Sequence, residues 1–470
     1  MSTSSNEQAK TLSQKLIYIY PLMISLIFLI ASPIAVLYTK EWDFFDNLVR
    51  ILTSPSKLVT DYFALGGLGS TLFNAAVCGL CANLIIHISH AKLNATILAG
   101  YMLVVAHCFY GLNFLNMWPP FFGIILYCTV MKKKVSENIH IAFFSTALAP
   151  FVSELCFRYT IENYSLSVIQ INWVGVVLSF VCGLAIGFVI PALLPGTTAM
   201  HRGYNLYKAG LAIGILGIFI NAFMYTTLGV EAPGKLDIVN DTYYALPYGY
   251  RGFMNVFFVV LFLITFVVGF ICNGKTLKGY RRLLKCTGKG TDYTDKFGMP
   301  LCMINISVYG MAILCYLNVV FILPSLWSAL PSGVGFTGAT AGIIFAALTF
   351  AADGQHVRNI FPIVVGYLVL FATVVVICLV AGFDIPWTLS TQAYINGLAF
   401  ATGLCPIAGK YGFKYGVLAG LMSAIICTIT AEMHGGFVLY NGGFNAGLTA
   451  LILIPILDFY NVKSVRDDDV

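Results

Sequence analysis

The chain has 470 residues, of which 59% are hydrophobic and only 10% are charged, and its formal net charge is +6. A soluble protein carries about 25% charged residues, so the charges here are too sparse to cover a water-exposed surface. The composition therefore excludes a soluble protein, a disordered chain and a nucleic-acid-binding protein. It predicts an all-α, multi-pass membrane protein.

Apolar runs that are candidates for membrane spans recur along the whole chain. A spanning helix needs about 20 apolar residues, and several of these runs are shorter. Fourteen candidate spans are predicted, seven in each half of the chain: 16–38, 67–89, 94–111, 117–131, 139–157, 170–193, 209–226, 253–272, 299–323, 335–352, 359–382, 388–405, 416–431 and 446–460. Among the shorter runs, 94–111, 117–131 and 446–460 are candidates for re-entrant or broken helices.

The lysine and arginine residues indicate the direction of the spans. If the N-terminus is cytoplasmic and the spans alternate, all but six of the 26 Lys and Arg residues fall in cytoplasmic loops, as the positive-inside rule requires. The six exceptions are Lys40, Arg50, Lys57, Arg158, Lys235 and Arg251. We therefore expect cytoplasmic tails at 1–15 and 461–470, and membrane halves at 16–230 and 253–460 joined by an external linker at 231–252.

The two halves of the chain share ordered blocks of sequence. Residues 200–210 (MHRGYNLYKAG) return as 433–443 (MHGGFVLYNGG), with six of the eleven positions identical, and the pattern G-x4-N-x2-P at 111–119 returns at 354–362. Seven spans in each half is an odd number, so the second copy is expected to enter the membrane from the opposite side. Inverted repeats are typical of secondary transporters, which bind substrate near the bilayer midplane between the copies. A duplicated bundle without transport is the alternative.

The doubled H-x-G-[Y/F]-x-L-Y-x-x-G element carries the sharpest functional signal. Its glycines permit positive φ and an unwound backbone, which is tolerated at membrane depth only where protein or a water-filled cavity satisfies it. The pattern therefore favours a broken helix or re-entrant loop along a solute pathway, in which the histidines titrate or bind the solute. The alternative is that each histidine caps a turn at the interface. The solute-binding residues predicted from this element are His201, Tyr207, His434, Tyr440, Asn441 and Asn445.

Two polar residues inside apolar runs are further candidates for the solute site. Asn74 lies among small residues at 66–79, where close helix packing is the competing interpretation. Glu154 is an ionisable residue near the end of a span, and such residues are functional candidates by default. Its alternative role is an interfacial pair with Arg158. His107, inside a short predicted span, fits a core and a cavity equally well.

Secondary candidates flank the two prolines that begin short helices. Asn116 and Asn359 lie three residues before these prolines, so helix capping is the leading interpretation. A buried helix N-terminus can also bind an anion or a dipole. Asn113, Asp353 and His356 lie beside these positions and are the remaining secondary candidates. For Asp353, a position at the membrane interface is the alternative.

The sequence contains no recognised catalytic or metal-binding spacing. Its thirteen cysteines are scattered, without the paired pattern of a zinc site, and the H-E-x-x-H and G-x-S-x-G motifs are absent. We therefore expect no enzymatic activity, no cofactor and no metal. The expected partners are a small solute, with coupling to Na⁺ or H⁺ left open, and lipid head groups at the basic 275–289 segment.

The segments 147–150 (ALAP), 359–362 (NIFP) and 403–412 (GLCPIAGKYG), together with the doubled element, resemble a two-repeat bacterial membrane family that is known only as a domain of unknown function. The resemblance covers nearly the whole chain and implies a protein of the bacterial cytoplasmic membrane, without naming a substrate. The first copy of the doubled element departs from the second at Arg202 and Lys208, so the two copies are not expected to act alike.

Two further segments, 439–448 (LYNGGFNAGL) and 72–79 (LFNAAVCG), look like segments of urea transporters. The leading hypothesis is a secondary transporter of a small polar or ionic solute, working by alternating access between inverted repeats. The alternatives are a channel-like facilitator of a small neutral solute and a non-transporting membrane scaffold.

Overall fold

The computed structural model describes residues 2–162 and 164–466, and the regular secondary structure in these ranges is helical apart from one isolated bridge between Gly249 and Phe336. Nine helices in the described part of the chain are apolar and long enough to cross a membrane. They are α1 (Ser2–Thr39), α3 (Tyr62–Ile88), α6 (Val135–Ser145) continuing through η1 (Thr146–Leu148) into α7 (Ala149–Phe157), α8 (Trp173–Met200), α9 (Lys208–Asn221) with η2 (Ala222–Thr227), α11 (Arg251–Cys272), α14 (Met299–Leu326), α16 (Val357–Ala381) and α21 (Asn441–Phe459). The protein is a multi-pass helical membrane protein.

The remaining predicted spans are shorter or broken. Four apolar helices are too short to cross a hydrocarbon core of about 30 Å: α4 (Ala95–His107), α5 (Trp118–Val130), α15 (Gly338–Leu348) and α19 (Phe413–Ile426). The run at 388–405 is divided into α17 (Gln392–Ala401), η3 (Thr402–Leu404) and α18 (Cys405–Tyr411), with Pro406 in the first turn of α18. Short helices at 94–111 and 117–131 agree with the prediction. The expected break at 446–460 is wrong, because these residues lie at the end of α21, which is continuous over 19 residues.

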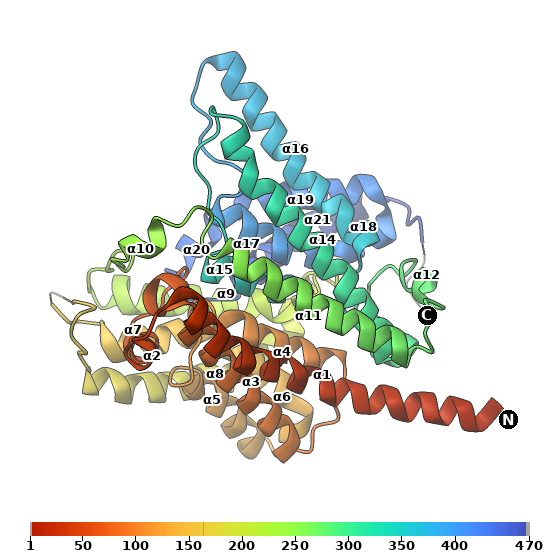
Figure 1. Ribbon diagram of the computed structural model, residues 1–470, viewed down its shortest axis with the longest axis horizontal. Helices are drawn as coiled ribbons and strands as arrows, with labels where there is room; N and C mark the ends of the chain where they lie inside the picture. The colour runs from red at the N-terminus through yellow and green to blue at the C-terminus, as the bar shows by residue number, and fades with distance from the viewer. Residues whose placement is uncertain (1, 163, 467–470) are drawn as a thin grey trace.

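The two halves repeat one order of elements. In chain order, α1, α3, α4, α5, α6–α7, α8 and α9 correspond to α11, α14, α15, α16, α17–α18, α19 and α21. The packing repeats as well, since α1 packs on α3 as α11 packs on α14, and α5 packs on α8 as α16 packs on α19. In Figure 1 the first half, in red to yellow, and the second half, in green to blue, lie against each other. The connecting helices are α2 (Phe44–Thr53), α10 (Asp241–Tyr244), α12 (Tyr280–Leu283), α13 (Tyr293–Phe297) and α20 (Thr430–Met433).

A buried asparagine anchors the turn after the short helix in each half. The Asn74 side chain donates from α3 to two backbone carbonyls in the turn after α4, over 3.1 and 2.9 Å. Asn305 donates from α14 to the equivalent two carbonyls after α15, over 2.8 Å each. The structure therefore uses Asn74 to hold backbone that α4 leaves unpaired, and this role is repeated in the second half.

Equivalent helices of the two halves pack directly against one another. A Cβ atom built on Gly210 of α9 would lie only 2.3 Å from the carbonyl carbon of Gly443, its own equivalent in α21. A Cβ on Gly338 of α15 would lie 2.6 Å from the carbonyl oxygen of Phe109, just after α4. A Cβ on Gly342 would lie 2.3 Å from the carbonyl oxygen of Ala106, three residues earlier and within α4. Going forward along α15 means going backward along α4, so these equivalent helices are antiparallel. The contacts place equivalent helices of the two halves directly against each other.

Candidate functional site

An aromatic cluster occupies the contact between the halves, close to the crossing of α9 and α21. It consists of three pairs of equivalent residues, all buried: Tyr207 and Tyr440, Phe144 and Phe400, and His107 and Phe350. The centroids of the two tyrosine rings are 5.7 Å apart, Phe400 packs on Tyr207 at 5.1 Å, and Phe144 lies 6.2 Å from Tyr440. We call these six residues the central cluster.

The two sides of the central cluster differ in polarity. Tyr207 packs edge-on against Phe350 at 4.8 Å, and its hydroxyl donates to a backbone carbonyl of α15 over 2.7 Å. Tyr440 faces His107 instead, with ring centroids 6.3 Å apart, and the ring of Tyr110 lies 5.6 Å from the same imidazole. Within the described residues, both nitrogens of His107 and the hydroxyls of Tyr110 and Tyr440 have no hydrogen-bond partner. An unsatisfied buried polar group costs about 1–3 kcal/mol, so a polar molecule bound here would gain hydrogen bonds from groups that now have none.

The doubled element forms the turns that deliver the two tyrosines to this cluster. Gly203 and Gly436 adopt positive φ angles of 74° and 78°, and α9 and α21 begin immediately after the tyrosines. The Leu206 N–H donates over 3.0 Å to the Gly403 carbonyl oxygen in η3 of the second half. The Leu439 N–H donates over 2.9 Å to the Ala147 carbonyl oxygen in η1 of the first half. The predicted non-helical backbone is confirmed, and each turn is satisfied by the opposite half.

The other predicted residues of the doubled element make local contacts. His434 Nε2 lies 2.9 Å from Asn441 Oδ1. The Asn445 amide donates to the carbonyl and hydroxyl oxygens of Ser423 over 3.2 and 3.1 Å, which ties α21 to α19. The imidazole of His201 is buried and has no hydrogen-bond partner in the described part of the chain. Of the predicted solute-binding residues, Tyr207 and Tyr440 are the pair that the structure brings together in the central cluster.

The secondary candidates lie in and beside the turns that precede α5 and α16. Asn113 and Asn116 bond reciprocally before α5, each side-chain oxygen accepting from the other residue's N–H over 3.0 and 2.8 Å. His356 and Asn359 make the equivalent reciprocal bonds, which form a capping box at α16, over 2.9 and 3.2 Å. Asp353 lies in the turn that precedes this second cap. The capping interpretation holds in the second half, where His356 is the N-cap residue of α16 and Asn359 completes the capping box, whereas the N-cap residue of α5 is Met117 and no side chain caps that helix.

Glu154 belongs to a buried ion cluster on one face of the protein. Its Oε2 atom lies 2.9 Å from Arg158 Nη2, and its Oε1 atom accepts from the Tyr225 hydroxyl over 3.0 Å and lies 3.8 Å from Lys57 Nζ. The Lys57 ammonium also lies 4.4 Å from the Tyr225 ring centroid and 4.8 Å from that of Phe437. Burial lowers the pKa of Lys57 to about 8, with the Glu154 charge opposing the shift and the Arg158 charge adding to it. The predicted pair of Glu154 with Arg158 is confirmed, and we call the four polar side chains the Glu154 ion cluster.

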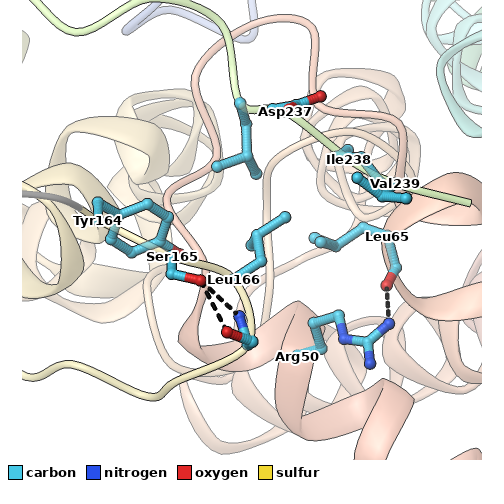
Figure 2. A pocket seen from close by; sticks show the side chains of 10 residues that line it. Arg50, Leu65, Tyr164, Ser165, Leu166, Asp237, Ile238 and Val239 are labelled. Carbon is cyan, nitrogen blue, oxygen red and sulfur yellow. Dashed lines mark hydrogen bonds between the residues drawn. The ribbon is translucent and has the colours of Figure 1, made fainter.

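Two neighbouring cavities open above the Glu154 ion cluster. One, of about 530 Å³, is lined by Arg158 and Tyr225 of the cluster and by Tyr164. Tyr164 also lines the second, of about 410 Å³, shown in Figure 2, where Arg50 donates to the Leu65 carbonyl oxygen over 3.5 Å. The first cavity therefore reaches Arg158 and Tyr225 of the Glu154 ion cluster, and the second adjoins it at Tyr164.

A related arrangement occurs where the first copy of the doubled element meets the loop after α12. Lys289 Nζ lies 4.3 Å from the ring centroid of Tyr204, which is the equivalent of Phe437. This lysine lines a cavity of about 490 Å³ together with Lys208 and Arg202, and Arg202 is paired with Asp458. In both halves, a loop lysine thus covers the aromatic residue of the doubled element from the opposite half.

Together, the fold and its repeated contacts define a multi-pass helical membrane protein built from two copies of one unit. The family model of a protein of unknown function, DUF1576, matches the chain twice, over residues 40–226 and 272–459. The chain belongs to the DUF1576 family, as the resemblance to a two-repeat family of unknown function predicted. No curated protein and no solved structure matches the chain.

The sequence left His107 open between a core and a cavity position and did not single out Tyr110 beside it. Tyr110 carries no motif, and His107 stands at the position that Phe350 takes in the second half, so no repeat pattern marks it. The difference between the repeats is itself the signal: a histidine ends α4, whereas the equivalent residue in the turn after α15 is a phenylalanine. That signal becomes readable only when α4 is aligned with α15.

Proposed function

We propose that the protein is a transporter of a small polar solute that binds on the His107 side of the central cluster. The observation that carries this proposal is the set of fully buried, unpartnered groups of His107, Tyr110 and Tyr440 at the contact between the two copies. Native proteins rarely leave such groups unsatisfied without an ordered water or a ligand. Their position at the contact between the two copies supports a solute site, because transporters with internal repeats bind substrate between the repeats.

The packing between the halves supports inverted repeats. α4 and α15 are equivalent and antiparallel, so a twofold axis that relates them must be perpendicular to both helices. If these helices run along the bilayer normal, the axis lies in the membrane plane and the copies are inverted. In the proposed topology both termini lie in the cytoplasm of a bacterial cell, in keeping with the distribution of Lys and Arg.

The cavities support alternating access. Those at the Glu154 ion cluster and the one beside Lys289 open beside the two copies of the doubled element, while the central cluster between these copies is closed by aromatic rings. We infer that rocking of one copy against the other opens the central cluster first to one cavity system and then to the other. The glycine contact of α9 and α21 allows such a movement, because no side chains interlock at Gly210 and Gly443.

A channel-like facilitator of a small neutral solute is the second candidate. Both segments that look like urea-transporter segments contribute to the centre: residues 439–448 contain Tyr440, and residues 72–79 contain Asn74, which anchors the turn after α4. A facilitator would carry its solute down a gradient without Na⁺ or H⁺. Solute flux measured with and without ion gradients separates this candidate from a coupled transporter.

The experiment that tests the proposed function is solute-induced thermal stabilisation of the purified protein. Small amides, amino acids, nucleobases and inorganic anions are screened with and without Na⁺, because a solute that binds the folded state raises its apparent stability. We expect a stabilising solute whose effect is lost in Tyr440→Phe and His107→Phe. Tyr101→Phe is the matched control, because this buried hydroxyl already has hydrogen-bond partners in α1, the Pro21 carbonyl oxygen and the Ser25 hydroxyl, which are not part of the cluster. Stabilisation that is unchanged in both cluster variants, or absent for all solutes, contradicts the proposal.

A further inference from the structure

A deep apolar groove exists in the second half of the protein and is filled in the first half. The groove has a volume of about 360 Å³ and lies between α14, α15, α16 and α17. Its lining is apolar apart from the hydroxyls of Tyr316 and Thr402, and it contains no charged side chain: Ala312, Ile313, Tyr316, Leu317, Ile343, Val357, Ile360, Phe361, Val364, Leu368, Ile395, Leu398, Ala399 and Thr402.

Three lining positions differ in size between the repeats, because Ala399 and Val364 replace larger residues of the first half whereas Ile343 replaces the smaller Gly100. Ala399 and Val364 line the groove, and the equivalent residues of the first half are Phe143 and Phe121. The two phenylalanines are buried, and their ring centroids lie 6.3 Å apart, so they fill the equivalent space between α5 and α6. In the second half the side chain of Ile343 takes part of this space, because Phe143 packs against Gly100 in the first half, and the remaining groove is room that a protein interior does not normally leave empty.

The mouth of the groove opens on the lipid-facing surface. Phe361 and Leu368 line the groove on α16 and are 57% and 38% exposed, and α16 is a candidate membrane span. Figure 1 shows α14 and α16 running alongside each other, with their far ends projecting beyond the neighbouring helices. Because the lining contains no charged side chain and its exposed residues Phe361 and Leu368 lie on a candidate membrane span, we expect hydrocarbon rather than water at the mouth of the groove.

We propose that this groove is a binding site for one acyl chain of a membrane lipid. The chain takes the place that Phe121 and Phe143 occupy in the first half. At the inner end of the groove it reaches Thr402, whose hydroxyl accepts from the Gln355 amide over 2.7 Å, and this amide lies 3.5 Å from the Tyr207 hydroxyl. The bound chain therefore lies one hydrogen-bonded side chain away from the central cluster. The site stands on its own and does not depend on the proposed transport function.

The test is native mass spectrometry of the detergent-purified, delipidated protein with added dioleoyl phosphatidylcholine. We expect the wild type to retain a bound lipid, and Ala399→Phe, which restores the ring of the first half, to lose retention several-fold. Val369→Phe is the matched control, because it adds the same ring to an exposed position of α16 that does not line the groove, and it should bind like the wild type. If Ala399→Phe fails to fold, Val364→Phe makes the same test from the facing helix.

Equal lipid retention in the wild type and in a folded groove-filling variant overturns the proposal. A dimer that forms without lipid and is lost in Ala399→Phe also overturns it, because a second copy of the chain would then occupy the groove. Retention that the groove-filling variant and the Val369→Phe control reduce equally points to lipid on the general surface and is a third contradicting result.

Discussion

Asp61 and Asp292 each cap the short helix of the opposite half. Asp61 accepts from the Gly338 N–H at the start of α15 over 2.8 Å, and Asp292 accepts from the Ala95 N–H at the start of α4 over 3.3 Å. Each aspartate also caps a helix of its own half, so it joins two helix N-termini whose partial positive charge favours a carboxylate. The two equivalent bonds run in opposite directions and hold α4 and α15 in their antiparallel contact.

Loss of one of these caps should loosen the contact between the halves. We expect Asp61→Ala to lower the free energy of unfolding by about 1–2 kcal/mol, because helix N-cap side chains contribute about this much. Thermal unfolding of the purified protein measures the change. Asp46→Ala, at an exposed position in the first turn of α2, is the control and should shift the midpoint little. Equal shifts in the two variants would contradict the inter-half role.

The glycine crossing of α9 and α21 predicts opposite effects for two helix glycines. In Gly210→Ala the new methyl group meets the backbone of Gly443, so we expect a lower unfolding midpoint or loss of folded protein. In Gly196→Ala the methyl group meets nothing within 4 Å, and alanine favours the helix by about 1 kcal/mol over glycine. Thermal unfolding of both variants measures the shifts, with a lower midpoint expected for Gly210→Ala and a higher one for Gly196→Ala. An unchanged midpoint in Gly210→Ala would contradict the close crossing.

Removing the Glu154 charge should destabilise the protein far more than removing a surface carboxylate. Glu154→Gln leaves Arg158 and Lys57 buried without their counter-charge, which costs about 3–5 kcal/mol when a buried pair is broken. Glu137→Gln breaks an exposed pair with Lys134, which is worth about 1 kcal/mol at most. Chemical unfolding curves of both variants give the comparison. Similar losses would show that the Glu154 ion cluster is not held away from water.

Lys57 should make stability rise with pH in the alkaline range. Its pKa is lowered to about 8 in the folded protein from 10.5 in the unfolded chain. Between these values the unfolded chain binds more protons at this residue, so the free energy of unfolding rises with pH. Lys57→Met lacks this contribution. We therefore expect the wild type to gain stability relative to Lys57→Met above about pH 8, measured as the difference between their unfolding midpoints. Parallel pH profiles would contradict this prediction.

Much of the architecture could be predicted from local patterns. Hydropathy indicates the membrane class, and the doubled element indicates both the repeats and the two tyrosines that meet in the central cluster. The tripeptide Thr-Asp-Tyr at 60–62 also recurs at 291–293, but nothing local identifies its role. Its aspartates bond to residues 277 and 197 positions away in the chain. Such partners are set by how the halves pack, which no local pattern contains.

The polar residues of the spans were harder to interpret for a physical reason. Asn74 has the same residue type and burial whether it binds a solute or backbone, and only its partners decide between the two. Its equivalent Asn305 was hidden because the glycines around Asn74 are missing there. Conversely, His107 and Tyr110 have unsatisfied groups that cannot be recognised from sequence, since satisfaction is a property of the packed neighbours.

The central claim is that the two halves are inverted copies, and labelling of equivalent loops tests it most directly. Lys133 lies in the exposed loop between α5 and α6, and Asp384 lies in the equivalent exposed loop between α16 and α17. Single cysteines are placed at each position in a variant without the native cysteines and are treated with a membrane-impermeant maleimide, before and after the cells are permeabilised. We predict labelling at Asp384→Cys in intact cells and labelling at Lys133→Cys only after permeabilisation. Labelling of both positions from the same side would contradict the inverted arrangement and, with it, alternating access between the two copies.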